Sequence, residues 1–457
     1  MVDFADYAAA AEDVARQFRR EAARPDPIRF FAYPKGNGSF RSLCLPSVKD
    51  LVLLRAAAGY MALATERALA DIPSVYSGRL ARGVPDWRFR AKPYERFRKD
   101  AAKRAKQWGC QLMVRTDVRS YYPSIDIARL AVYLLADLRC RYGPTAFYLE
   151  RILHWQQRQG LKGLPVGPEA SHVPGTAFLK PVDVAMLPLT DGYFRYTDDI
   201  VYFVADPGLG DLLSTLDASL GERGLMRGMD KTEVHDDPIA AREAIDRRLF
   251  ASLSNGLSSR SPLAMRAVKR EFIRDVVEGQ GNARDFRWYI QVFANRGDPF
   301  AVRWLVSDWD RFNIDPRKSS DYVASCGLDD PEVVGRAMER LSASNADTMS
   351  GTELHLLRVF SQVETGNDER RLFEKVAMDS SRPIDVRSWA WMAAASAAGF
   401  GAEAAAEAAV EESDPAIRRA IVLSLRGKTS RSRNWALKDV ARKHPDAAVA
   451  CAWALAA

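Results

Sequence analysis

The 457-residue sequence lacks the features that mark membrane-spanning, secreted and disulfide-stabilised proteins. It contains no uninterrupted apolar run of about 18 residues, so a membrane span is not expected. Residues 1–20 mix charged and apolar side chains as an amphipathic helix does, without the apolar core of a signal peptide. The five cysteines are scattered and form no CxxC pair, which disfavours a disulfide framework or a zinc site. These absences predict a protein of the reducing cytoplasm.

The chain is too long for one ordinary hydrophobic core, and its positive charge is unevenly distributed. Hydrophobic residues make up 47% and charged residues 27%, as in globular proteins, and the length predicts at least two domains. The net charge is +7, yet residues 24–106 alone contain 18 Lys and Arg against 7 Asp and Glu. This basic stretch favours a polyanionic partner such as nucleic acid, with a solvated basic face as the alternative.

Three zones follow one another along the chain. Residues 25–110 are basic and aromatic, with Gly-Asn-Gly at 36–38 predicting a β-hairpin turn. Residues 111–237 alternate short apolar strands with helices. Beyond about residue 270 the pattern is helical, with Asp-Pro pairs at 298–299, 330–331 and 414–415. Gaps of about 30 residues between such breaks predict stacked helical hairpins of the HEAT type, with a plain helical bundle as the alternative.

Three aspartates stand where strands are predicted to end or turn. Asp117 ends an apolar-rich strand over residues 111–118, a place where turn or cap residues are also common. Two apolar-aromatic segments, 193–196 and 200–204, flank Asp198 and Asp199, which predicts a hairpin with two carboxylates at its tip. Adjacent acids repel, and a hard divalent cation would relieve that repulsion; a solvent-exposed turn is the alternative.

The three acids together predict a two-metal site. If both strand ends lie side by side, Asp117, Asp198 and Asp199 can share two Mg²⁺ ions, with Mn²⁺ as a substitute. One ion would lower the pKa of an attacking 3′-hydroxyl, and the other would neutralise the leaving pyrophosphate. Nucleotide polymerisation requires this arrangement and little else from side chains.

The motifs around these acids resemble those of reverse transcriptases. Tyr196-Thr197-Asp198-Asp199 resembles the YxDD motif, and residues 117–125 resemble motif A, within a similarity that covers roughly residues 28–270. The resemblance implies an α+β right-hand polymerase fold of fingers, palm and thumb. It also implies metal ligation by Asp117, Asp198, Asp199 and the carbonyl of Val118. Tyr122 falls at the family's aromatic steric gate, which would exclude a ribose 2′-hydroxyl and select dNTPs; core packing is the alternative.

Further blocks occur in the family's order. GLPVGPEASH at 163–172 resembles motif B, the loop that packs against the incoming base and template, with Val166 and Gly167 at its centre. Lys231 resembles the motif D lysine that protonates the departing pyrophosphate. Lys35 and Arg41 match fingers residues that grip the triphosphate. Four domains are predicted: an N-terminal helix and basic fingers over 1–110, a palm over 111–237, a helical thumb or connector over 238–280, and all-α helical repeats over 281–457.

One departure from the common pattern points to a subgroup. Most retroelement enzymes have Gln-Gly where this chain has Val166-Gly167, and the VGPxxS form resembles bacterial abortive-infection and other defence-associated reverse transcriptases. The C-terminal helical region resembles that group too, whereas HNH, maturase, retron VTG and RNase H signatures are absent. The resemblance implies antiphage DNA synthesis, RNA-templated or template-independent. An RNA template or non-coding RNA, dNTPs, the DNA product and self-association through the repeats are the expected partners.

Members of that group are known for untemplated or protein-primed DNA synthesis. Beyond residue 260 the only tyrosines are Tyr289 and Tyr322, which makes them the candidate primers in that region, with core packing as the alternative. Two other classes of function stay open. One is a catalytically silent RNA-binding scaffold on a reverse-transcriptase fold, and the other is an interaction sensor based on the helical repeats.

Overall fold

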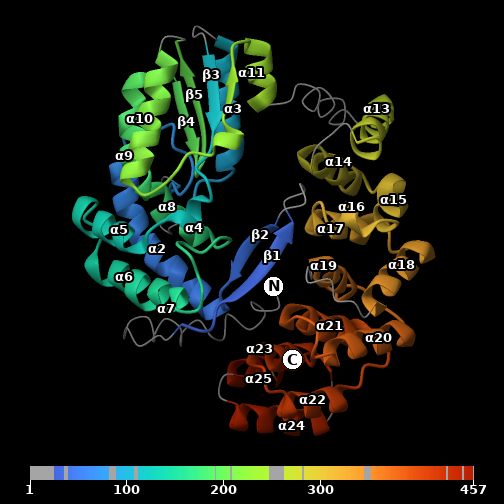
Figure 1. The fold of residues 1–457 in the computed structure, drawn as a ribbon. Coiled ribbons are helices and arrows are strands. Elements are labelled where there is room, and N and C mark those ends of the chain that lie inside the picture. Colours follow the sequence, from blue (N-terminus) through green and yellow to red (C-terminus); the bar gives the residue numbers. More distant parts are fainter. Residues whose placement is uncertain are drawn as a thin grey trace. The chain divides into compact units, whose positions relative to one another are not determined.

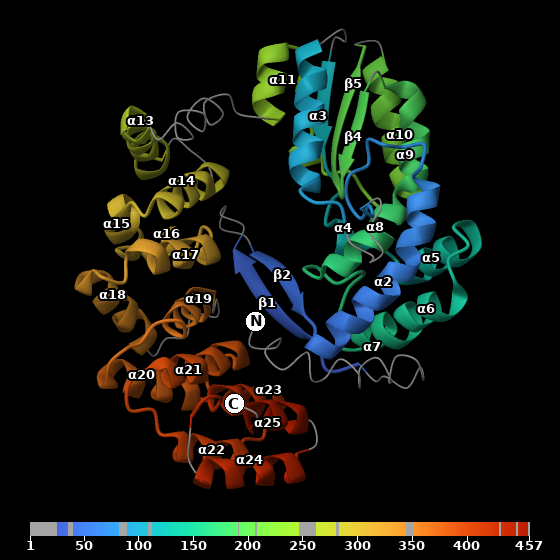
Figure 2. The same ribbon diagram turned by 180° about the vertical axis from the view of Figure 1, so that it is seen from behind.

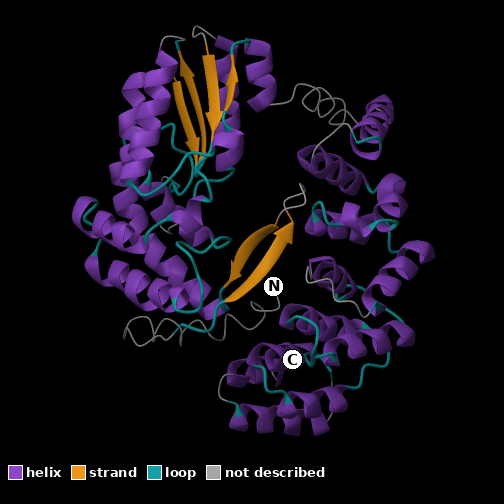
Figure 3. Ribbon diagram, in the orientation of Figure 1, coloured by secondary structure: helices purple, strands orange, loops and turns teal. Residues whose placement is uncertain are grey.

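The chain forms two compact units in the computed structural model. The structure describes residues 25–34, 40–81, 89–107, 112–190, 192–205, 208–245, 262–279, 283–343, 351–428, 431–444 and 447–455. Among the described residues, those of 25–30 and 43–245 form the sheet unit, and those of 31–42 and from 262 onward form the helical unit. The described residues are mostly helical, with a four-stranded sheet and a separate two-stranded hairpin (Figure 3).

The four-stranded sheet is antiparallel throughout and has the order β4-β5-β3-β6. Its strands are β3 (Leu112–Thr116), β4 (Gly192–Tyr196), β5 (Asp199–Val204) and β6 (Glu233–His235). The two central strands, β3 and β5, consist almost wholly of buried residues, as expected for strands covered on both faces. Thr116 pairs with Ile200, so the end of β3 lies at the same edge of the sheet as the β4–β5 turn.

Helices cover both faces of this sheet (Figures 1 and 2). On one side lie α9 (Lys180–Met186) and α10 (Leu209–Glu222), and on the other α3 (Pro93–Gln107) and α11 (Pro238–Ile245). α10 is amphipathic, because its leucines at 212, 216 and 220 recur every four residues and are all buried. α3 presents Phe97 and three alanines to the core that it forms with strand residues and α11.

The rest of the described sheet unit is a group of helices at the edge of the sheet where β3 ends (Figure 1). The longest, α2, begins after Ser47, whose hydroxyl accepts a hydrogen bond from the amide of Asp50. The helices are α2 (Val48–Ala68), α4 (Tyr121–Ser124), α5 (Ile127–Val132), α6 (Tyr142–Ala146), α7 (His154–Gln157) and α8 (His172–Phe178). α8 packs against α2 and is buried along most of its length.

The predicted hairpin consists of β1 (Arg29–Pro34) and β2 (Phe40–Leu45), which pair with each other. Its turn lies outside the described residues. At the base of β2, the amide of Cys44 donates to the carbonyl of Val166 at 2.8 Å, within the sheet unit. Nearer the turn, Tyr33 of β1 donates its hydroxyl to Asp315 of the helical unit at 2.9 Å, and burial, followed by the charge of Asp315, raises the pKa of Tyr33. The hairpin is therefore divided between the two units.

The described part of the helical unit beyond residue 260 contains helices and no strands. They are α13 (Pro262–Phe272), α14 (Ala283–Arg296), α15 (Val302–Val306), α16 (Trp309–Phe312), α17 (Pro316–Cys326), α18 (Pro331–Ser342), α19 (Gly351–Phe360), α20 (Asn367–Met378), α21 (Ile384–Ser396), α22 (Ala402–Glu411), α23 (Pro415–Ser424), α24 (Arg431–Lys443) and α25 (Ala448–Leu455). Helices α14, α17, α19, α21, α23 and α25 each pack against the next in that series. A second series runs through α15, α18 and α20.

The Asp-Pro pairs mark the beginnings of helices. At 298, 330 and 414 the aspartate side chain accepts a hydrogen bond from a backbone amide of the first turn, and the proline follows as the first helical residue. Asp315-Pro316 has the same arrangement at the start of α17. Across the described residues, none of the helices is both long and apolar enough to cross a lipid bilayer.

Candidate functional site

The structure brings Asp117, Asp198 and Asp199 to one edge of the four-stranded sheet. Asp117 follows the last residue of β3, Asp198 lies in the β4–β5 turn, and Asp199 begins β5. The pairing of β3 with β5 places these two strand ends next to each other. The three carboxylates are close enough to interact electrostatically, since the negative charges of Asp198 and Asp117 both raise the pKa of Asp199.

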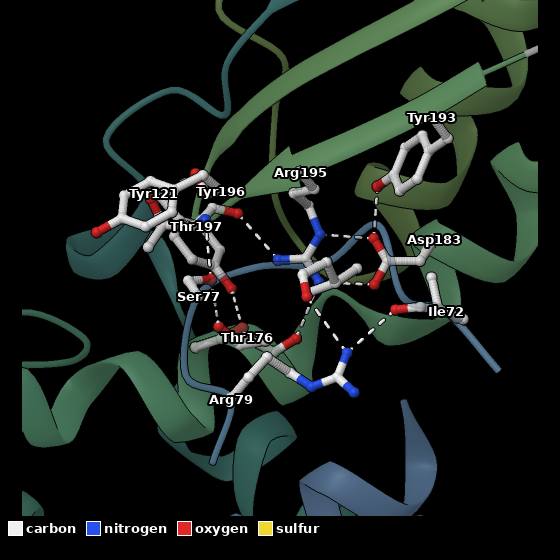
Figure 4. A network of polar contacts seen from close by, with 12 residues as sticks. Ile72, Ser77, Arg79, Tyr121, Thr176, Asp183, Tyr193, Arg195, Tyr196 and Thr197 are labelled. Atoms are coloured by element: carbon white, nitrogen blue, oxygen red, sulfur yellow. Dashed lines mark hydrogen bonds and ion pairs between the residues drawn. The ribbon is translucent and has the colours of Figure 1, made fainter. Parts of the chain in front are cut away.

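A buried polar network fixes the backbone of the β4–β5 turn (Figure 4). Thr197 has a left-handed backbone, with φ of 52°, which a β-branched residue adopts only when its surroundings impose it. Its amide donates to the hydroxyl of Ser77 at 2.9 Å, and its carbonyl accepts from Nη1 of Arg195 at 2.9 Å. Both backbone groups of Thr197 are thereby held in place, and the two aspartates that follow it are positioned by the same contacts.

Arg195 is the centre of that network. Its Nε and Nη2 bind the two oxygens of Asp183 at 2.5 and 2.6 Å, and Nη2 also donates to the carbonyl of Thr176 at 3.2 Å. Tyr193 donates its hydroxyl to the same carboxylate. Burial by itself would lower the pKa of Arg195, but the charge of Asp183 outweighs it and holds this pKa above its ordinary value. Arg195 therefore stays charged at every physiological pH.

Asp117 has one paired and one unpaired carboxylate oxygen. Lys231, in the short 3-10 helix Met229–Lys231, donates its ammonium group to Oδ2. Oδ1 is buried and has no hydrogen-bond partner among the described residues. The amide of Gly228 donates to the Asp117 carbonyl at 2.8 Å, and a side-chain carbon at residue 228 would lie 2.0 Å from Oδ1. Glycine is therefore required for this close approach.

Electrostatics at this edge favour a cation. Burial, and then the charges of Asp198 and Asp117, raise the pKa of Asp199 from 3.8 to about 6. Carboxylate oxygens are the ligands that Mg²⁺ prefers, and the unpaired Oδ1 of Asp117 suits the same role. As the side chains stand, however, the described residues contain no group of three acidic, histidine or cysteine side chains arranged to hold a metal ion. The donor chemistry fits a divalent cation, although Lys231 is paired with one of the predicted ligands.

Tyr122 lies in α4 with its hydroxyl 2.7 Å from Nδ1 of His172. Burial lowers the pKa of His172, so at neutral pH the ring is uncharged and a ring nitrogen can accept from the tyrosine. The ring of Tyr122 also touches Gly175, where an added Cβ would lie 3.0 Å from Cε1. The sequence did not single out His172, which begins α8, because a lone histidine carries no signal of its own.

The loop that resembles motif B packs against the residues beside Tyr122. The amide of Leu164 donates to the Tyr122 carbonyl at 2.9 Å. Gly163 has φ of 60°, and a Cβ there would lie 2.1 Å from that same carbonyl oxygen. Val166 and Gly167 follow, with Val166 joined to Cys44 of β2. The structure thus places the loop between the Tyr122 segment and the base of the hairpin.

The remaining predicted site residues lie elsewhere. Lys35 is outside the described residues, and Arg41 is exposed on β2 among residues that group with the helical unit. Tyr289 is buried and donates its hydroxyl to Asp275 at 2.7 Å. Tyr322 is buried as well, and its hydroxyl is engaged by the carbonyl of Asp298 and the amide of Ala301. Neither hydroxyl is available to attack a nucleotide without leaving its partners, which favours the packing alternative.

Comparison with known proteins finds likeness only at a distance, among solved structures. No protein-family model matches the chain, and no curated protein matches it either. A solved structure of telomerase from Candida albicans, in complex with a TWJ fragment of telomeric RNA, is similar to it with 12% sequence identity and a TM-score of 0.35. The match covers 75% of this chain and 67% of the telomerase chain. At this distance the likeness assigns the chain to no family.

Proposed function

We propose that this protein is a reverse-transcriptase-type DNA polymerase that adds dNTPs to a growing strand. The proposal rests on one observation. Asp117, Asp198 and Asp199 lie close together at one edge of the sheet, and Lys231 pairs with Asp117. These three aspartates and the carbonyl of Val118 would hold two Mg²⁺ ions, for which Mn²⁺ can substitute. Bound there, the ions supply activation of the 3′-hydroxyl and neutralisation of pyrophosphate.

The protein's own residues have separate tasks in this proposal. Arg195 and Ser77 hold the turn that carries Asp198 and Asp199. Lys231 is placed to donate a proton to the departing pyrophosphate once it leaves Asp117. Tyr122 closes the space that a ribose 2′-hydroxyl would need, and His172 fixes its hydroxyl. The site therefore selects dNTPs over rNTPs.

We extend the proposal to the fold and the biological role. In it residues 1–110 include the fingers, residues 111–237 form the palm, residues 238–280 form the thumb or connector, and residues 281–457 form a HEAT-like repeat. The resemblance of residues 163–172 to defence-associated reverse transcriptases supports antiphage DNA synthesis, with an RNA template or without one. A non-coding RNA and further copies of this chain would be its partners, in the cytoplasm.

A catalytically silent RNA-binding scaffold is the second candidate, because Lys231 neutralises Asp117 without any metal. Incorporation of labelled dNTPs by the purified protein, with Mg²⁺ or Mn²⁺ and with or without added RNA, separates the two. We expect incorporation by the wild type and its loss in Asp198→Asn. Absence of incorporation in both proteins under every condition, with RNA binding retained, would establish the scaffold.

A further inference from the structure

One face of helix α3 carries a continuous row of cations. The residues follow one another at intervals of three, four and three positions, so their side chains share one side of the helix. This basic row consists of Arg96, Lys99, Lys103 and Lys106, all of them exposed. Successive members are like-charged neighbours, and each such pair costs about 0.2–0.5 kcal/mol in an isolated helix. Asp100, four residues after Arg96 and three before Lys103, is the one acid between them, and an anionic partner would offset the repulsion further.

The other cations of α3 have structural tasks that the basic row does not share. Arg98 donates Nε to the carbonyl of Ile245 at 3.0 Å and joins α3 to α11. The guanidinium of Arg104 lies over the ring of Phe203, 5.1 Å from its centroid, and joins α3 to β5. Within the part of the chain that the structure describes, no ion pair involves the four cations of the row. Anchoring of the helix therefore does not explain them.

The basic row begins close to the candidate catalytic site. Tyr94, in the first turn of α3, lies edge-on to Tyr196 with ring centroids 5.1 Å apart, and Tyr196 is the first residue of the YxDD-like motif. α3 packs along β4 of the same sheet (Figure 2). From Arg96 to Lys106 the helix rises by about 15 Å, so the row leads away from the aspartates over several nucleotides. The row and the site belong to the same compact unit.

We propose that the basic row binds the phosphate backbone of the growing DNA strand. This inference rests on the proposed function, because the strand whose 3′-hydroxyl reaches the carboxylates is the one being extended. Flexible lysines act as point charges and contact phosphates without reading bases. The row would therefore hold the product independently of its sequence.

The test is the salt dependence of single-stranded DNA binding. Fluorescence anisotropy with an oligothymidylate of about 15 nucleotides compares the wild type with the variant Lys99→Gln/Lys103→Gln/Lys106→Gln. The slope of log K against log salt is negative, and each lost phosphate contact reduces its magnitude by about 0.7. The slope of the triple variant should therefore be smaller in magnitude by about 2. Affinity at low salt should fall on the order of tenfold or more. Substitution of the same lysines by arginine should restore both quantities.

A matched control removes three positive charges from exposed positions of the helical unit. Arg371→Gln/Lys375→Gln/Lys438→Gln changes α20 and α24 and should leave the slope unchanged. Equal slopes for the wild type and the α3 variant would overturn the inference, as would a loss confined to RNA or to anionic lipid vesicles. Incorporation of dNTPs, measured in parallel, tests the proposed function separately, since the binding measurement needs no turnover.

Discussion

Arg195 and Asp183 form a bidentate ion pair in which neither side chain is exposed to solvent. Breaking such a pair leaves one charge buried without compensation, which typically costs about 3–5 kcal/mol. We therefore expect Asp183→Asn to lower the free energy of unfolding by about that amount and to reduce dNTP incorporation by loosening Thr197. Urea denaturation measures the first effect.

The pair between Arg227 and Asp217 provides the matched control. Its geometry is also bidentate, at 2.8 and 2.9 Å, but Asp217 is about half exposed. Asp217→Asn should cost less than about 1 kcal/mol, as surface ion pairs do. Similar losses for both variants would contradict the structural role assigned to Arg195.

Gly228 allows Asp117 to keep its position. Gly228→Ala would place a carbon 2.0 Å from Oδ1 of Asp117, so the carboxylate must move. We expect dNTP incorporation to fall by at least about 100-fold, because small misplacements at a reacting centre have effects of this size. Gly221→Ala, in α10 with no atom nearby, should retain full activity and gain about 0.5–1 kcal/mol of stability. Full activity in Gly228→Ala would exclude Asp117 from catalysis.

The hydrogen bond between Tyr122 and His172 should contribute to sugar selection. His172→Ala frees the tyrosine ring to move, and a hydrogen bond of about 1 kcal/mol corresponds to a loss of roughly fivefold to tenfold in the preference for dNTP over rNTP. Tyr122→Phe removes the same bond and should have a similar effect. Single-nucleotide kinetics measure kcat/KM for both substrates.

The double variant Tyr122→Phe/His172→Ala completes a thermodynamic cycle with these single variants. If the two residues act through their shared hydrogen bond, the double variant should lose no more selectivity than either single one. Additive losses would show that each residue acts separately. Tyr122→Ala, which removes the ring itself, should lower selectivity further than all of these variants.

Asp50 should make stability depend on pH. It is a buried residue in the first turn of α2, and burial together with the charge of Asp26 raises its pKa from 3.8 to about 7. The folded protein thus holds a proton that the unfolded chain releases, so stability should decrease as pH rises from about 4 to about 7. Asp50→Asn should remove this component and raise the melting temperature at pH 8 but not at pH 4. Parallel pH profiles for the two proteins would refute this assignment.

Local patterns of the sequence predicted the parts of the site that depend on strand ends. An apolar-rich run before Asp117 and apolar-aromatic segments on either side of Asp198 and Asp199 predicted the strands, and the antiparallel pairing of β3 with β5 brings the aspartates together. The hairpin of β1 and β2 was predicted from Gly-Asn-Gly at 36–38 between two apolar and basic segments, and the two strands do pair. The Asp-Pro pairs were interpreted as breaks between helices, and the structure shows their physical basis as caps of the next helix.

Contacts between distant segments could not be predicted in this way. Ser77 reaches Thr197 across 120 positions, and His172 reaches Tyr122 across 50, and neither partner has a distinctive local sequence. Asp183 sits in a helix as one of many acids, and only folding shows that it neutralises Arg195. For the basic row, the sequence showed the excess of positive charge. That four of the cations share one face of α3 became clear only from the bounds of the helix.

The division of the hairpin between two units limits how the protein can be taken apart. The chain enters the helical unit at Phe31, returns to the sheet unit at Leu43, and leaves it again after Ser259. A protein cut after residue 259 would deprive Tyr33 of Asp315, its hydrogen-bond partner in α17's cap. In such a protein the hairpin would keep the hydrogen bond between Cys44 of β2 and Val166, and it would lose the one between Tyr33 of β1 and Asp315.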